Sequence, residues 1–439
     1  MIPEDDASVT GRPAPRWWHA ATVDIRPLRR HRDFRLLFIG RFVSFFGSMI
    51  TSVAFPYQVY QLTHSVFLVG VLGVVEFAAI LAVAFIGGAL ADAQDRRLMV
   101  LLSEVALMVC SLLLAGNAAL AHPQVWLLFV IATAFGGLDA LQRPSLDAML
   151  PRLVAKSELT AAAALGQLRG TLGMTAGPAL GGVLLAVIGL PLTYMVDVGT
   201  FVVGLACLVL MRAVPPPVDA ERPSIRRVVE GLKYARSRQE LLGTYFVDMI
   251  AMFFGMPMAL FPAIAQGIGG AKVLGLLYAA PAVGSFVFSA TSGWTGRIHR
   301  HGMGVAIAAI LWGFAIIGFG LVGSLWLALF FLAAAGAADA MSGVYRQTIW
   351  NQTIPDSLRG RMASIELLSY ASGPSLGNFE AGVVASIFSV RVSIVSGGVL
   401  CVIGCALCAA ALPAFRAYDA RRYHSAPDPA AASVKREKQ

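Results

Sequence analysis

Charged residues are scarce in this chain, and their scarcity excludes most soluble folds. Only 13% of the 439 residues are Asp, Glu, Lys or Arg, whereas a soluble domain carries about 25% because its surface must be hydrated. Hydrophobic residues make up 57% of the chain, and the mean hydropathy is +0.71. Most of the surface must therefore face something other than water.

Residues that build metal centres and catalytic sites are also sparse. The five cysteines all lie in apolar segments without neighbouring His or carboxylate groups, so we expect them to be small packing residues. The seven histidines fall in loops or tails. No Gly-rich phosphate loop followed by Lys-Ser/Thr occurs, which excludes that route to ATP hydrolysis. We expect no enzymatic activity, no metal and no cofactor.

Long apolar segments are abundant instead. A helix needs about 20 mainly apolar residues to cross a bilayer, and no segment shows the alternation of a barrel strand. The segments are 34–60, 67–91, 98–120, 124–147, 159–187, 191–211, 241–265, 273–296, 303–323, 325–350, 363–388 and 392–413. They predict an all-α membrane protein with about twelve transmembrane helices.

The distribution of Lys and Arg predicts the orientation in the membrane. The net charge of +9 comes from 34 Lys and Arg residues, and they fall in alternate connections rather than in one nucleic-acid-binding patch. The connections on one side contain only Lys272 and Arg391. The positive-inside rule therefore predicts a plasma (inner) membrane protein with both termini in the cytoplasm. The N-terminus lacks the pattern of a cleaved signal peptide.

The chain divides into two similar halves. Gly136-Gly137-Leu138-Asp139-Ala140 is echoed about 200 residues later by Gly336-Ala337-Ala338-Asp339-Ala340, and Gly177-Pro178-Ala179-Leu180-Gly181 is echoed by Gly373-Pro374-Ser375-Leu376-Gly377. Val69-Gly70 and Leu274-Gly275 open the second segment of each half. Such a duplication is typical of rocking transporters. The predicted divisions are a cytoplasmic segment 1–33, six-helix halves 34–211 and 241–413, a cytoplasmic linker 212–240 and a cytoplasmic tail 414–439.

The loop after the second apolar segment carries a recognisable motif. It reads Gly87-Gly88-Ala89-Leu90-Ala91-Asp92-Ala93-Gln94-Asp95-Arg96-Arg97. This resembles the signature loop of the major facilitator superfamily, although Ala93 replaces the usual Arg. The resemblance implies a conformational latch formed by Gly88, Asp92, Arg96 and Arg97, which breaks when the halves rock. An ordinary basic turn is the alternative.

The fifth apolar segment carries a second motif, Gly173-Met174-Thr175-Ala176-Gly177-Pro178-Ala179-Leu180-Gly181-Gly182. Gly173, Gly177, Pro178, Gly181 and Gly182 match the element that marks proton-coupled drug exporters of that superfamily. Small residues at this spacing allow close helix contact, so packing alone is an alternative. The exporters' Arg-containing motif of the fourth span is not reproduced, because Arg143 is followed by Pro144.

Further segments narrow the resemblance to one branch. Leu37-Phe38-Ile39-Gly40-Arg41-Phe42-Val43-Ser44, Pro56-Tyr57-Gln58-Val59 and Leu260-Phe261-Pro262-Ala263 look like the first and seventh spans of the enterobactin-exporter family, which also contains macrolide-type efflux proteins. The resemblance covers residues 28 to 415. It implies the major facilitator fold, and it specifies the substrate poorly.

Four charged residues within the spans are candidates for proton coupling. A charge at the bilayer centre costs about 2.5–3.5 kcal/mol, so these residues should face water or one another. Glu76 has no basic residue within a turn of its own helix, and either carries a proton or is hydrogen-bonded to a neighbouring helix. Asp139 and Arg143 lie four residues apart and can pair. Arg41 either attracts an anionic substrate or neutralises Glu76 or Asp139.

Substrate contacts are expected in the second half as well. Asp248 and Asp339 are candidates either for the substrate cavity or for pairing between the halves. Aromatic residues such as Tyr57, Phe254 and Tyr278 could line an adaptable apolar cavity, but such residues are more often plain packing.

The sequence thus favours a monomeric secondary antiporter in the bilayer, exporting a small amphipathic molecule, a siderophore or a drug, in exchange for protons. A proton-coupled importer and a non-transporting membrane sensor or enzyme remain alternatives. A passive channel is disfavoured because no half-span filter segment occurs.

Overall fold

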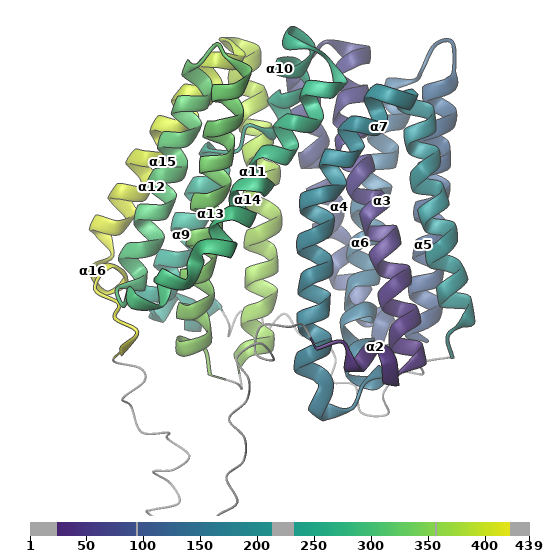
Figure 1. Ribbon diagram of the computed structural model, residues 1–439, viewed down its shortest axis with the longest axis horizontal. Helices are drawn as coiled ribbons and strands as arrows, with labels where there is room; N and C mark the ends of the chain where they lie inside the picture. The colour runs from purple at the N-terminus through teal and green to yellow at the C-terminus, as the bar shows by residue number, and fades with distance from the viewer. Residues whose placement is uncertain (1–23, 94, 213–231, 356–357, 422–439) are drawn as a thin grey trace, which may run out of the picture.

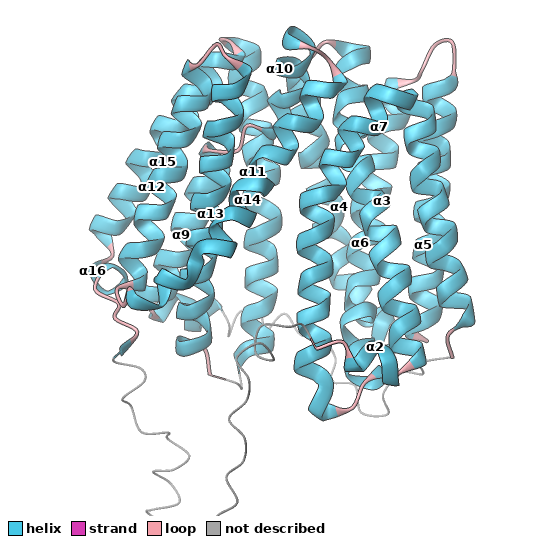
Figure 2. Cartoon of the chain, viewed as in Figure 1, coloured by secondary structure: helices cyan, strands magenta, loops and turns pink. Residues whose placement is uncertain are grey.

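A computed structural model describes residues 24–93, 95–212, 232–355 and 358–421 of the chain. Within these ranges the secondary structure is helical and no strand occurs (Figure 2). A helix satisfies every backbone donor and acceptor within one segment, which is what a lipid environment requires. Large apolar side chains such as Val187, Phe286 and Trp326 lie exposed on the outside of the bundle, as expected where lipid is the solvent.

The helices form two groups that lie side by side (Figure 1). The first comprises α2 Arg26–Arg30, α3 Arg32–Thr63, α4 Val66–Ala93, α5 Arg96–Ala119, α6 Val125–Leu153, η1 Lys156–Glu158 and α7 Leu159–Leu210. The second comprises α9 Gln239–Phe254, η2 Met258–Leu260, α10 Phe261–Ile268, α11 Ala271–Thr291, η3 Ser292–Arg297, α12 His301–Leu321, α13 Leu325–Thr353, α14 Arg359–Ile387, α15 Val390–Ala411 and α16 Pro413–Arg416.

Ten helical stretches of the described chain are long and apolar enough to cross a membrane. One of them contains α7, a 52-residue helix interrupted at Gly189, whose φ of 75° and ψ of 176° are not helical. Glycine adopts this left-handed backbone without strain, and the predicted boundary between 159–187 and 191–211 falls here. Helix α14 has 29 residues and is not among the ten. The count of twelve spans stays a prediction.

The predicted span 241–265 lies within Gln239–Ile268, one of these ten stretches, but its helix is broken. Helix α9 ends at Phe254, Gly255 and Pro257 follow, and the chain continues through η2 into α10. The break leaves the Gly255 carbonyl without its helical donor, and the indole Nε1 of Trp312 donates to it at 3.1 Å. A side chain from α12 thereby compensates for the interrupted backbone ladder, as required at membrane depth.

The two halves touch mainly through two pairs of helices, α4 with α14 and α7 with α11. A Cβ atom at Gly70 would lie 2.8 Å from the Asn378 carbonyl oxygen, and one at Gly275 would lie 2.9 Å from Cα of Gly182. Gly70 and Gly275 occupy corresponding positions of the duplication, so the two contacts, called here the seams, are related by it. Both glycines lie near the first residues of α4 and α11, at the end of the bundle opposite α2 and α16 (Figure 1).

Residues of the predicted terminal segments pack against the bundle. Arg30 donates to Glu158 at 3.0 Å and the His31 ring lies 2.7 Å from the other Glu158 oxygen, which ties α2 to η1. The first residues of the predicted tail pack against the second half, because Phe415 is fully buried and Tyr418 donates to Gln352 at 2.8 Å. Residues 1–23, most of the linker and residues 422–439 lie outside the described chain.

Candidate functional site

Arg41 is neutralised by a carboxylate that the sequence did not suggest. It lies on α3 and forms an ion pair with Glu104 of α5, whose side chain is completely buried. The same guanidinium nitrogen donates to Gln142 of α6 at 3.2 Å. Neither Glu76 nor Asp139, the partners expected from the sequence, pairs with Arg41. The charge of Arg41 therefore connects three helices of the first half.

Glu76 lies on α4 where this helix comes very close to α6. A Cβ atom at Gly136 would be 2.5 Å from the Glu76 carbonyl oxygen, so only glycine allows this approach. Within the described chain the Glu76 carboxylate has no ion-pair or hydrogen-bond partner. The charged group that interacts with it electrostatically is the carboxylate of Asp139, which has the same sign and repels it. Two carboxylates thus neighbour each other at membrane depth.

Asp139 and Arg143 form the pair that their four-residue spacing predicts. The Arg143 Nη2 and Asp139 Oδ2 atoms are 3.4 Å apart, and both side chains are about half exposed, at 48% and 49%. Arg143 lies ten residues from the end of α6, which corresponds to about 15 Å along the helix. A charged pair this deep and this exposed must face a watery space rather than lipid.

Asp197 is buried in the first half, and among the described residues its carboxylate accepts hydrogen bonds from hydroxyl groups alone. Thr51 of α3 and Ser111 of α5 donate to its Oδ2 atom at 2.7 and 2.8 Å. Thr200, one turn along α7, lies 3.3 Å from Oδ1. Thr51 and Ser111 are the donors that satisfy this carboxylate, since the single Thr200 hydroxyl hydrogen has a nearer acceptor in the Asp197 carbonyl oxygen, at 2.7 Å. The arrangement joins α3, α5 and the second part of α7.

The second half contains an Arg between two carboxylates. Arg346 of α13 forms an ion pair with Asp248 of α9, and its Nη2 atom lies 3.5 Å from Oδ1 of Asp339, also on α13. The Arg346 side chain is 4% exposed. The sequence interpretation missed Arg346, although its distance of seven residues from Asp339 places both on one helix face. Within the part of the chain that the structure describes, neither aspartate pairs with a residue of the first half.

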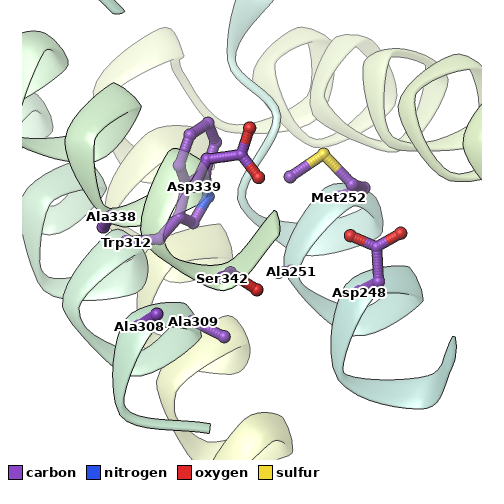
Figure 3. A pocket seen from close by; sticks show the side chains of 9 residues that line it. All are labelled: Asp248, Ala251, Met252, Ala308, Ala309, Trp312, Ala338, Asp339 and Ser342. Carbon is purple, nitrogen blue, oxygen red and sulfur yellow. The ribbon is translucent and has the colours of Figure 1, made fainter. Parts of the chain in front are cut away.

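A pocket opens beside this group (Figure 3). It lies between α9, α12 and α13. Its lining consists of Asp248, Ala251, Met252, Ala308, Ala309, Trp312, Ala338, Asp339 and Ser342. Both predicted aspartates thus meet at one cavity. Among the described residues, no cluster of His, Cys, Asp and Glu is suited to hold a metal ion.

The three aromatic residues proposed as cavity residues, Tyr57, Phe254 and Tyr278, are not among the residues that line this pocket. Tyr57 is 8% exposed and belongs to the hydrophobic core. The Phe254 ring packs edge-on against the Phe253 ring, with 4.9 Å between the two ring centroids. The ring centroids of Tyr278 and Phe261 are 5.1 Å apart, and the Tyr278 hydroxyl donates to the Met258 carbonyl at 3.4 Å. Packing, the commoner role of such residues, accounts for all three positions.

The predicted latch lies partly outside the described residues and stays a prediction. Gly88 and Asp92 belong to α4, and their side chains lie outside the described part of the structure. Arg96 is buried at the start of α5. Arg97 donates to the carbonyl oxygens of Leu208 and Val209, both at 2.7 Å. Arg97 therefore binds the last turn of α7, where the Leu208 carbonyl also accepts a hydrogen bond from the Met211 amide at 3.2 Å.

The glycines of the exporter motif face two different neighbours. Gly173, Gly177 and Gly181 lie against α3, where added Cβ atoms would meet Phe45, Met49 and Ile50. Gly182 faces the other way, onto Gly275 of the second half. Pro178 lies buried within α7. The motif thus packs the first half together on one face and forms a seam on the other.

Two helical halves that meet through glycine contacts and contain paired charges at membrane depth define a multi-pass membrane transporter rather than an enzyme. The family model described as Transmembrane secretion effector matches residues 22–439. The chain belongs to this family of the major facilitator superfamily, as its motifs predicted.

Curated relatives are similar over most of the chain. The enterobactin exporter EntS of Citrobacter koseri is 29% identical over 385 residues, which cover 87% of this chain and 92% of that protein. EntS of Shigella boydii serotype 4 is 30% identical over 364 residues, which cover 81% of this chain and 86% of that protein.

Solved structures show the same fold. A bacterial homologue of the human lysosomal transporter Spinster, in an inward-facing and unoccupied conformation, superposes with a TM-score of 0.72 at 16% identity, covering 92% of this chain and all of that one. A bacterial homologue of the iron transporter ferroportin superposes with a TM-score of 0.66 at 14% identity, covering 88% and 98%.

Proposed function

We propose that this protein exports a small amphipathic molecule from the cytoplasm in exchange for protons, with a catecholate siderophore as the first candidate. The observation that carries this proposal is its similarity, over 87% of the chain, to proteins named enterobactin exporters. The exporter motif in α7 supports the direction of transport, and a macrolide-type drug is the alternative cargo.

Alternating access accounts for the position of the seams. The basic connections predict that the termini are cytoplasmic, which places the ends of α4 and α11 that form the seams on the external side. In this orientation the protein is closed to the outside. Export then requires the two seams to open while the opposite ends of the halves approach each other. We expect a single chain to perform this cycle.

Proton coupling is assigned to the first half. Glu76 has no cationic partner within the described chain, and the neighbouring Asp139 is held by Arg143. A carboxylate that is deep in the membrane and unpaired is stabilised by taking up a proton. When the opening changes sides, Glu76 would bind a proton from outside and release it to the cytoplasm, and Arg143 would keep Asp139 ionised.

The test uses purified protein in liposomes that contain a pH-sensitive dye. A proton gradient is imposed, and candidate catecholate siderophores and macrolides are added to wild type, Glu76→Gln and the control Asp419→Asn. Asp419 lies near the C-terminus, and a hydrogen bond from the Arg421 guanidinium lowers the pKa of its carboxyl group, so this control removes a charge far from the site.

The expected result is discharge of the gradient by a substrate for wild type and the control, and no discharge for Glu76→Gln. Equal discharge by all three proteins would show that Glu76 is not the carrier and would direct the search to Asp139. If no candidate discharges the gradient for wild type, the proposed substrates or the proton coupling are wrong. Accumulation of substrate on the cytoplasmic side would indicate an importer.

A further inference from the structure

We infer that Arg169 of α7 binds the anionic group of an aromatic acid, such as a catecholate, during export. This role rests on the proposed export function and narrows its cargo, because a macrolide ring carries no aryl anion. Arg41, the residue expected to attract an anionic substrate, is already engaged by Glu104 and Gln142. The charge of Arg169 is available instead.

Arg169 lies at membrane depth without a partner. It follows Leu159, the first residue of α7, by ten positions, which corresponds to about 15 Å along the helix. Within the described chain its guanidinium forms no ion pair and no hydrogen bond, and its Nε atom is buried without a partner. A cation at this depth is costly unless water or an anion meets it.

The free end of the Arg169 side chain borders a watery space. Its two terminal nitrogens are not buried, unlike its Nε atom. On α6, Asp139, Arg143 and Asp147 follow one another at intervals of four residues and share one helix face, and both Arg143 and Asp147 are exposed. Arg169 interacts electrostatically with Asp147 but forms no ion pair with it. Arg169 therefore lies beside the space that the Asp139–Arg143 pair faces, where a dissolved ligand can reach it.

A neighbouring guanidinium makes an anion favourable at this place. Arg41 of α3 and Arg169 of α7 carry charges of the same sign and repel each other, and the two helices pack against each other (Figure 1). An anion bound to Arg169 would offset this repulsion. The planar fork of guanidinium N–H donors matches the two oxygens of a carboxylate or a catecholate.

Helix α3 provides a surface for the aromatic part of the ligand. Phe38, Phe42 and Phe46 form a row, called here the aromatic row, with 6.3 and 6.1 Å between successive ring centroids. All three side chains are half-buried, so part of each ring remains open. Aromatic rings attract one another at such distances, so an aryl ligand can pack against the aromatic row.

The aromatic row lies at the level of Arg169. Four residues before Arg169, Leu165 packs in a hydrophobic cluster that also includes Phe38. Four residues after it, a Cβ atom at Gly173 would clash with the Phe45 ring. Residues spaced by four share one face of a helix. Arg169 therefore lies between these two contacts with α3, where one ligand can meet both its guanidinium and the aromatic row.

The experiment measures binding by isothermal titration calorimetry on the purified full-length transporter. The probe is 2,3-dihydroxybenzoate, and the matched control ligand is 2,3-dihydroxybenzamide, which keeps the catechol ring and replaces the carboxylate with a neutral amide. The variants are Arg169→Gln, Arg169→Lys and the control Arg300→Gln. Arg300 is exposed just before α12, so the control removes a positive charge from the second half. The folding of every variant is checked by gel filtration.

We expect wild type to bind the carboxylate roughly tenfold or more tightly than the amide, because only the carboxylate forms charged hydrogen bonds. Arg169→Gln should weaken binding of the carboxylate roughly ten- to a hundredfold and leave binding of the amide unchanged. Arg169→Lys should recover part of the affinity, since it keeps the charge but not the fork. Arg300→Gln should bind like wild type.

Three results would overturn the assignment: no binding of the carboxylate, equal affinity of wild type for the two ligands, or full affinity for the carboxylate in Arg169→Gln. Because the two ligands are compared on wild type, the assignment can be refuted even if no Arg169 variant folds.

The liposome assay separates this site from the proposed function. If Arg169 is required for binding of the carboxylate but no siderophore discharges the proton gradient, the anion site stands and proton-coupled export is wrong. If a catecholate siderophore discharges the gradient equally for wild type and Arg169→Gln, export stands and the anion site is wrong.

Discussion

A single methyl group at one seam should shift the protein towards its outward-open state. In Gly275→Ala the new Cβ would lie 2.9 Å from Cα of Gly182 and 3.2 Å from its carbonyl carbon. Carbon atoms in contact normally lie about 3.5–4.0 Å apart. Since the opposing atoms are backbone, no side chain can rotate away, and α7 and α11 must separate by about 0.5–1 Å.

The expected magnitude follows from this overlap. Extra methyl groups in a tightly packed contact cost about 1–3 kcal/mol, and the cost arises only while the seam is closed. About 1.4 kcal/mol corresponds to a tenfold change in an equilibrium constant, so the ratio of closed to open seam should fall roughly 5- to 150-fold. A protein closed at this end in nearly all molecules would then populate both states measurably.

A matched control separates the contact from the helix propensity. Gly170 lies within α7 and an added Cβ would meet no neighbouring atom within 4 Å. Both Gly→Ala changes stabilise their helices by about 0.5–1 kcal/mol, but only Gly275→Ala introduces a clash. The difference between the two variants therefore measures the seam alone.

The assay is double electron–electron resonance between spin labels at Lys156 and Arg300 in a cysteine-free background. These exposed positions belong to different halves and lie at the end of the bundle opposite the seams. We expect Gly275→Ala to add a population with a shorter distance between the labels, and Gly170→Ala to resemble wild type. Identical distance distributions for the two variants would refute the view that this backbone contact controls the closed state.

Three further predictions concern contacts that stabilise the first half. Glu158→Gln weakens the contact of Glu158 with Arg30, so we expect faster trypsin cleavage around α2; unchanged cleavage would mean that α2 is held by other contacts. Arg97→Ala removes two donors from the last turn of α7, and the free energy of unfolding should fall by about 1–3 kcal/mol, measured as a lower thermal midpoint; an unaltered midpoint would contradict the capping role. Asp197→Leu leaves buried hydroxyls without an acceptor and should destabilise by about 2–4 kcal/mol, whereas Asp197→Asn should retain most of the stability; equal effects of the two would argue against hydrogen bonding as the cause.

The sequence predicted the helical architecture well because lipid imposes one strong constraint. Apolar segments long enough to cross a bilayer can satisfy their backbone only as helices, and the boundary near Gly189 falls where a loop was expected. The break after Phe254 was not predicted, since the residues on both sides are equally apolar and hydropathy does not register a lost backbone bond.

The charged pairs were predictable only within one helix. The Asp139–Arg143 pair follows from a spacing of four residues. Arg41 and Glu104 lie on different helices, 63 residues apart, and no periodic pattern relates them. A partner on another helix depends on how the helices rotate against each other, which packing determines and composition does not.

The backbone contacts at the seams have a consequence for where the substrate selectivity of such transporters can reside. Their closest approaches are from backbone to backbone, Gly70 to the Asn378 carbonyl and Gly275 to Gly182. The Asn378 side chain is engaged within its own half, where it accepts a hydrogen bond from the Ala259 amide at 2.9 Å. Main-chain atoms are the same in every residue, so the barrier they form cannot distinguish one passing molecule from another. Selectivity must then reside deeper in each half, where substitutions can alter it without changing the barrier itself.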